Sequence, residues 1–371
     1  MSPVRPDVAV VGAGIVGAAC AEALATRGLR VEIFEALFPG SGSTGSAMGH
    51  LVVLDDSEAQ FALSSFSRGL WERRTAELPA GVEDVPAGTL WVAADGEEMA
   101  HVRAKAAFHG ARGVKTEILD SKGLSEAEPN LRPGLAGGLR VPGDRILYPP
   151  AAARFRLSVA ERRGTRLRTE EVLEVGAGFV RTAAGRTDAG AVLVAAGAAS
   201  PSLLPGLPVV PRKGHLVITD RAPGFCRHQL IELGYLRSAH GNARESVAFN
   251  LQPRATGQML LGSSRELVGF DLSVNRPLVA RMVRRGIEYL PSIGALPVLR
   301  TWTGFRPATP DNLPLIGRWP ALRDVWVAAG HEGLGITTSL GTASLLAALI
   351  SGGAPSIDPS PYAPDRMALR A

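Results

Sequence analysis

Two short apolar segments near the start of the chain predict the first elements of the fold. Residues 8–11 are all apolar, and apolar residues recur in 29–34, as in strands that are covered on both faces of a parallel sheet. The alanine-rich segment 15–27 lies between them and predicts a helix that ends at Gly28. Together these segments predict a strand–helix–strand unit with parallel strands.

The remaining pattern divides the chain into two kinds of structure. Alternating apolar and polar residues between 213 and 303 predict antiparallel strands, for example at 246–251 and 258–262. Elsewhere we expect buried strands at 191–196 and 325–330 and helices at 58–78, 97–110, 151–163 and 335–350. The whole pattern predicts an α/β fold in which a discontinuous, Rossmann-like nucleotide-binding domain is joined to a second, largely antiparallel-sheet domain for the substrate. The first domain is predicted at 1–80, 140–212 and 303–371, and the second at 81–139 and 213–302.

Composition narrows the classes of protein that remain. The chain has 371 residues and a net charge of +5 but no block of basic residues, so we expect no nucleic-acid partner. Cys20 and Cys226 are too few for a disulfide framework and lie in no metal-ligand pattern, so we predict no metal site. The first residues lead directly into a strand, and the apolar segment 339–350 is short for a membrane span. We therefore expect a cytoplasmic protein and leave attachment to a membrane surface open.

A glycine-rich turn follows the first predicted strand and opens the first predicted helix. Gly12 permits a tight turn, Gly14 allows the backbone to approach a pyrophosphate, and Gly17 allows the helix and strand to pack closely. The helix then presents its N-terminal N–H groups to the phosphates. Glu35 ends the second strand, where its carboxylate accepts hydrogen bonds from ribose hydroxyls and repels a 2′-phosphate. This pattern predicts a dinucleotide site and disfavours NADP.

The turn alone leaves FAD and NAD open, and three further segments favour FAD. The loop 41–50 consists mainly of Ser, Thr, Gly and Ala, which leave space for a pyrophosphate and a flavin ring. The second segment is 194–198. The third is 330–337, a glycine-rich turn that enters the last helix and whose backbone donors stabilise negative charge on a reduced ring.

Several of these motifs occur together in one known family. Besides the first turn and Glu35, they are the segments 192–200, 211–215, 304–317 and 330–331. With them the chain resembles the D-amino-acid oxidase/glycine oxidase family of FAD-dependent oxidoreductases over nearly its whole length. The segments 45–57 and 249–258 are similar to bacterial D-hydroxyproline dehydrogenases. They are less similar to the flavin subunits of proline dehydrogenase complexes and of hydrogen cyanide synthase.

One arginine and three pocket residues are candidates for contact with the substrate, and the alternative for the arginine is a surface residue that caps a loop. Arg306 lies in the segment where the family binds the substrate carboxylate, and a guanidinium binds a carboxylate through two hydrogen bonds. Met48, His50 and Tyr235 are expected near the substrate, with hydrogen bonding in the protein as the alternative for His50 and packing as the alternative for Tyr235. The residues expected to bind the cofactor are Gly12, Gly14, Ile15, Val16, Glu35, Ala36, Ser43, Thr44, Ser46, Ala47, Val172, Ala196, Gly197, Gly304, Gly330, Gly333, Leu334, Gly335, Ile336 and Thr337.

The resemblance also implies a reaction. We expect a D-amino or imino acid, such as cis-4-hydroxy-D-proline, to be oxidised to the imine by hydride transfer to flavin N5. Electrons would pass to a partner subunit or a quinone rather than to oxygen. No Cys lies between Arg300 and Ile316, where sarcosine oxidases attach flavin, and Thr44 lies near the position of a His link in other members, so we expect non-covalent FAD.

Other assignments stay open on the sequence. One alternative is a glycine or sarcosine type of oxidase that produces hydrogen peroxide. Another is a non-catalytic flavin-binding subunit of an assembly. Homo- and hetero-oligomers are both compatible with the sequence.

Overall fold

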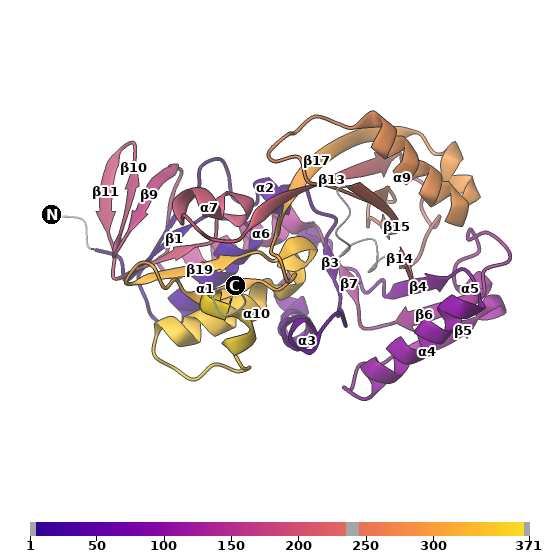
Figure 1. Cartoon of the computed structure of the whole chain (residues 1–371), viewed down its shortest axis with the longest axis horizontal. Coiled ribbons are helices and arrows are strands. Elements are labelled where there is room, and N and C mark those ends of the chain that lie inside the picture. The colour runs from indigo at the N-terminus through magenta and orange to yellow at the C-terminus, as the bar shows by residue number, and fades with distance from the viewer. Residues whose placement is uncertain (1–4, 235–244, 367–371) are drawn as a thin grey trace.

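The computed structural model describes residues 5–234 and 245–366, which form two lobes (Figure 1). The first lobe is built on a six-stranded sheet in which five strands are parallel and only β18 runs antiparallel to its neighbour. In spatial order its strands are β18 (Leu315–Arg318), β19 (Val325–Ala329), β12 (Ala191–Val194), β1 (Val8–Val11), β2 (Val31–Phe34) and β8 (Arg166–Arg168). The predicted strand–helix–strand unit is confirmed as β1, α1 (Ile15–Thr26) and β2, since β1 and β2 pair in parallel.

Both faces of the six-stranded sheet are covered, as its apolar strands require. One face carries α1, α10 (Gly335–Ile350), α6 (Pro149–Glu161) and α3 (Glu58–Glu72), whose apolar side chains form one buried cluster with β1 and β2. The other face is covered by a three-stranded antiparallel sheet of β9 (Val172–Gly176), β10 (Phe179–Thr182) and β11 (Gly185–Asp188).

The helix α10 explains the most hydrophobic part of the sequence. Residues 332–350 are apolar and long enough to cross a membrane by composition, but two thirds of that segment is buried inside the protein. The helix contacts both α1 and α3. Its apolar surface therefore belongs to the core of the first lobe.

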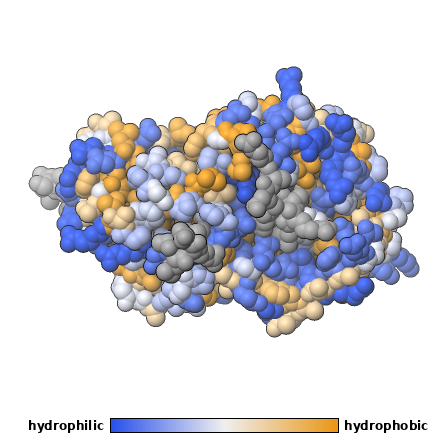
Figure 2. Space-filling view, viewed as in Figure 1, coloured by the Kyte–Doolittle hydropathy of each residue, from blue (hydrophilic) through white to orange (hydrophobic). Residues whose placement is uncertain are grey.

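The second lobe contains an eight-stranded sheet that is antiparallel except where β14 and β4 pair. Its helices are α4 (Gly96–Gly110), α5 (Ser121–Ala127) and α9 (Arg276–Tyr289). In spatial order its strands are β17 (Val298–Ala308), β13 (Val210–Thr219), β16 (Met259–Glu266), β15 (Glu245–Pro253), β14 (Gln229–Glu232), β4 (Thr89–Ala93), β6 (Gly137–Val141) and β5 (Glu117–Asp120). The α/β class and the antiparallel second sheet are as predicted. In the space-filling view, hydrophobic and hydrophilic residues are interspersed over the visible face of both lobes (Figure 2).

The long strands β13 and β17 join the lobes (Figure 1). They pair from Val210–Ala308 to Thr219–Val298. The predicted boundaries at 212 and 303 fall inside these two strands, so the chain passes from one lobe to the other without a linker. The division into domains at those residues stays a prediction.

One predicted helix is too long. The segment 58–78 was expected to be helical throughout, but α3 ends at Glu72 and a short 3₁₀ turn follows at Thr75–Glu77. Pro79 ends the 3₁₀ turn rather than α3, since the residue before a proline is driven out of the helical region, and Leu78 is extended with φ −75° and ψ 126°. Four short elements complete the chain around the lobe junction: α2 (Gly42–Gly45), β3 (His50–Leu51), β7 (Arg145–Ile146) and α7 (Ser200–Leu203).

Candidate functional site

One long cavity runs from the glycine turn after β1 to the strands β13, β15, β16 and β17 of the second lobe. Its empty volume is about 1740 Å³, including space that is open to solvent. The predicted residues that line it are Gly12, Gly14, Ile15, Val16, Glu35, Ala36, Ser43, Thr44, Ser46, Ala47, Met48, His50, Val172, Ala196, Gly197, Gly304, Arg306, Gly333, Gly335 and Ile336. Tyr235 lies outside the described residues.

The glycine turn has the close contacts that its sequence predicts. Gly12 has φ +102°, and a Cβ there would lie 2.6 Å from the carbonyl oxygen of Ala195. A Cβ on Gly17 would lie 1.9 Å from the Gly12 oxygen. Both positions therefore need glycine. Gly14 differs, because its Cβ would meet only the Thr44 hydroxyl, at 3.2 Å, and its open side faces the cavity.

Glu35 is buried at the end of β2, where its carboxylate meets the glycine turn. One carboxylate oxygen accepts a 2.7 Å hydrogen bond from the Ala13 N–H. The other accepts from the Leu37 N–H at 3.0 Å and from the Ser41 hydroxyl at 3.3 Å. These bonds fix the carboxylate at the cavity wall, where it can accept hydrogen bonds from the hydroxyls of a ribose.

The loop 41–50 packs between α1 and β17. The Thr44 hydroxyl accepts a 3.0 Å hydrogen bond from the N–H of Ile15, in the first turn of α1. The indole N–H of Trp302 donates to the Ser46 carbonyl at 3.3 Å. A Cβ on Gly304 would lie 2.3 Å from the Ser46 Cβ, so glycine there permits the loop to lie against β17. The small residues thus bring the two lobes together along the cavity.

The late glycine turn forms another wall of the cavity. Gly333, Gly335 and Ile336 line it directly. Gly330, Leu334 and Thr337 do not line the cavity, although each was expected to bind the cofactor. They shape its wall instead: Gly330 turns the chain with φ +78°, Leu334 packs against the buried side chains of Val52–Leu54 and their neighbours, and the buried Thr337 hydroxyl donates a 2.8 Å hydrogen bond to the His50 carbonyl.

Two neutral histidines face this space. Burial lowers the pKa of His331 to about 3, and its Nε2 lies 3.0 Å from the Thr342 hydroxyl. The pKa of His50 is also lowered to about 3, first by burial and then by the positive charge of Arg306. The buried Nε2 of His50 has no hydrogen-bond partner among the described residues. A neutral ring nitrogen is therefore left at the cavity wall to bond a bound molecule.

Arg306 lies at the far end of the cavity on β17. Its guanidinium donates a 3.1 Å hydrogen bond to the Ser264 carbonyl of β16. A Cβ on Gly214 would lie 2.3 Å from the Arg306 Nη1, so a larger residue on β13 would displace the guanidinium from this position. Arg306 is therefore held where a carboxylate in the cavity can reach it.

These features fit an extended dinucleotide. The close-packed glycine turn and the N-terminus of α1 suit a pyrophosphate, while Glu35 suits a ribose. The 41–50 loop, the late turn and the unpartnered His50 nitrogen surround the remaining space toward Arg306.

Comparison with known proteins identifies the family. Residues 7–349 match the family described as DAO, FAD dependent oxidoreductase. The chain belongs to this family. It is therefore an FAD-dependent oxidoreductase, and the prediction of FAD is confirmed. The roles of individual site residues stay proposals.

Three similar proteins illustrate the range of the family. A glycine oxidase of Pseudomonas aeruginosa is 30% identical over 96% of this chain and 98% of its own length. A D-amino acid dehydrogenase of Xanthobacter autotrophicus is 33% identical over 80% of this chain and 71% of its own length. The crystal structure of an L-proline dehydrogenase from P. horikoshii superposes with a TM-score of 0.88 at 25% identity, covering 99% of both chains.

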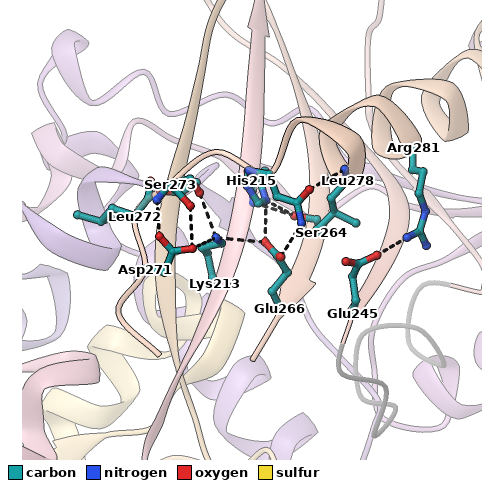
Figure 3. A network of polar contacts seen from close by, with 12 residues as sticks. Lys213, His215, Glu245, Ser264, Glu266, Asp271, Leu272, Ser273, Leu278 and Arg281 are labelled. Carbon is teal, nitrogen blue, oxygen red and sulfur yellow. Dashed lines mark hydrogen bonds and ion pairs between the residues drawn. The ribbon is translucent and has the colours of Figure 1, made fainter. Parts of the chain in front are cut away.

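The strands β13 and β16 of this flavoenzyme carry a network of polar contacts around Lys213, His215 and Glu266 (Figure 3). The Ser264 hydroxyl lies 2.8 Å from Nδ1 of His215, whose Nε2 accepts a 3.0 Å hydrogen bond from the Asn275 N–H. His215 therefore carries its proton on Nδ1, and burial lowers its pKa. Lys213 is almost fully buried and donates to Asp271 at 2.9 Å, with Glu266 3.4 Å away. This network fixes β13 and β16 beneath the Arg306 guanidinium.

Several cavity residues were not predicted from the sequence of the flavoenzyme. They include Asn250 on β15, Ser263 on β16, Leu216 on β13, and Phe305 and Glu332. For Asn250 a signal was present, because it is a polar residue inside the apolar run Val247–Leu251. Ser263 and Leu216 gave no comparable signal, because a serine or a leucine could equally lie on either face of its strand.

Proposed function

We propose that this enzyme oxidises a D-amino or imino acid to the corresponding imine and passes the electrons to an acceptor other than oxygen. The observation that carries the proposal is the position of Arg306, whose guanidinium enters the same cavity as the glycine turn. When bound, FAD accepts the hydride that leaves the α-carbon of the substrate. The protein supplies binding, orientation and a largely apolar environment.

Each residue near Arg306 has a defined part in this proposal. Arg306 binds the substrate carboxylate through two charge-assisted hydrogen bonds and so fixes the orientation of the α-carbon. Met48 and Leu216 form an apolar wall that excludes water. His50 stays neutral, so it adds no second positive charge beside the amine.

The similar proteins support an amino or imino acid and differ in the acceptor. Glycine oxidase and D-amino acid dehydrogenase are the names of two relatives, and L-proline dehydrogenase is that of a structural neighbour. The two dehydrogenases among these proteins favour a non-oxygen acceptor, a quinone or a partner subunit. An oxidase that forms hydrogen peroxide is the second candidate, which the glycine oxidase relative favours.

The decisive experiment is anaerobic bleaching of the flavin absorbance by a panel of D- and L-amino acids that includes proline and the hydroxyproline isomers. We expect bleaching by D-amino or imino acids, cis-4-hydroxy-D-proline among them. The reduced enzyme should then be reoxidised faster by a soluble quinone than by air. Rapid peroxide formation in air would favour the oxidase instead. If no amino acid bleaches the flavin, the catalytic proposal is wrong and a non-catalytic subunit is favoured.

A further inference from the structure

Two buried polar side chains at the substrate end of the cavity have unused hydrogen-bonding capacity. They are Asn250 on β15 and Ser263 on β16, and each is only 2% exposed. The Asn250 Oδ1 and the Ser263 Oγ have no hydrogen-bond partner among the described residues. Both residues line the cavity. Because buried polar groups are nearly always bonded, such a pair in a cavity wall points to a bound molecule.

The pair lies beside the carboxylate site. Ser263 directly precedes Ser264, whose carbonyl accepts the hydrogen bond from Arg306. Asn250 pairs with Gly262 on the neighbouring strand. A Cβ on Gly262 would touch Leu216 and Met48, so apolar side chains lie next to the pair. A substrate held by Arg306 would therefore meet the two polar groups beside an apolar part of the wall.

The chemistry of the pair selects among substrate side chains. The Asn250 Oδ1 accepts a hydrogen bond, and the Ser263 hydroxyl can donate one. An alcohol satisfies both, since it donates to the amide oxygen and accepts from the serine. A carboxylate has no proton to give to Oδ1. An ammonium could donate to both oxygens, but it would bring a charge without a countercharge into a buried wall. A plain hydrocarbon side chain leaves both groups unpaired.

We propose that Asn250 and Ser263 bind a hydroxyl group on the side chain of the substrate. The preferred substrates are then neutral amino or imino acids that carry a hydroxyl at the end remote from the carboxylate. This inference rests on the proposed function, because it assumes that Arg306 binds the carboxylate of the same molecule. It adds a specificity determinant that the carboxylate site does not provide.

The test compares two substrates that differ only in the hydroxyl, such as cis-4-hydroxy-D-proline and D-proline. The measured quantity is the second-order rate constant of anaerobic flavin bleaching for each. We expect the wild-type enzyme to prefer the hydroxylated member by at least about 30-fold, because the other leaves two buried groups unpaired. In Asn250→Leu and in Ser263→Ala the preference should fall at least about fivefold, through slower reaction of the hydroxylated substrate.

A matched control is available on the next strand. Gln229 on β14 is fully buried, and its side-chain amide also has no partner among the described residues, but it does not line the cavity. Gln229→Leu should therefore keep the wild-type preference. All three variants should keep the flavin absorbance spectrum, since the proposal places the pair against the substrate.

The outcomes separate this inference from the proposed function. The hydroxyl site is wrong if neither substrate bleaches the flavin but another amino acid does. It is also wrong if both substrates react equally well in the wild type and in the variants. In both cases the proposal of an amino-acid enzyme stands. If no amino acid reacts at all, the proposed function itself fails. A changed flavin spectrum in Asn250→Leu or Ser263→Ala would also overturn the inference, because the residue would then contact the cofactor.

Discussion

Replacing Gly14 by alanine should separate cofactor binding from folding. Gly14 has φ −65° and ψ 177°, a conformation that alanine adopts without strain. Its new Cβ would meet only the Thr44 hydroxyl, at 3.2 Å, and no backbone atom within 4 Å. The same methyl group would project into the cavity where we expect the pyrophosphate.

The two effects have opposite signs. Alanine restricts the unfolded chain and stabilises a compatible site by about 0.4–1 kcal/mol, which the contact with Thr44 partly offsets. The free energy of unfolding without FAD should therefore change by less than about 1 kcal/mol. Overpacking by one methyl group costs roughly 1–3 kcal/mol, which corresponds to FAD binding weaker by roughly 5- to 150-fold.

Two assays check this expectation. Titration of the flavin-free protein with FAD, followed by quenching of flavin fluorescence, measures the affinity. Urea unfolding without FAD measures stability. Gly17→Ala is the contrasting variant, because its Cβ would lie 1.9 Å from the Gly12 oxygen and should destabilise the protein by several kcal/mol. An unchanged FAD affinity in Gly14→Ala would refute the placement of the pyrophosphate at this turn.

Three further predictions follow from the site. Arg306→Met should lower the second-order rate constant for carboxylate substrates by at least about 30-fold while FAD stays bound, and a similar loss in the exposed control Arg300→Met would contradict the role of Arg306. Lys213→Met should destabilise the protein in urea by about 3–5 kcal/mol because it leaves buried Glu266 without a countercharge, whereas loss of the half-exposed Asp271 should cost much less. The free energy of unfolding, measured against pH, should fall as the pH drops from about 6.5 toward 3. In this range the unfolded chain binds protons at His50 and His331, whereas burial keeps both rings neutral in the folded protein. A flat profile would count against their burial.

Local signals were sufficient for the first lobe. The apolar run of β1, the alanine-rich α1 and the glycine turn are all recognisable within thirty residues of sequence, because strand burial, helix formation and a positive φ act on neighbouring residues. The end of α3 was not predicted, because Glu72 is followed by two arginines and not by a proline or glycine that would mark the end of a helix.

The substrate end was much less accessible to sequence analysis. Arg306 was found through its motif, but its supports on β13 and β16 come from segments about 90 and 40 residues away and meet it only through strand pairing. Asn250 and Ser263 come from β15 and β16, whose pairing shifts register between Val247 and Asn250, and such an irregularity cannot be read from the residues of either strand alone.

The sequence by itself thus determined that a dinucleotide binds and where the chain turns around it, since these follow from backbone conformation and from the absence of a Cβ. Only the tertiary structure decided which side chains face the substrate and in what state. His50 shows why: its neutrality comes from burial among distant segments and from the charge of Arg306, 256 residues further along the chain. Desolvation and long-range charge depend on what the fold brings together, so neither can be read from the residues beside His50 in sequence.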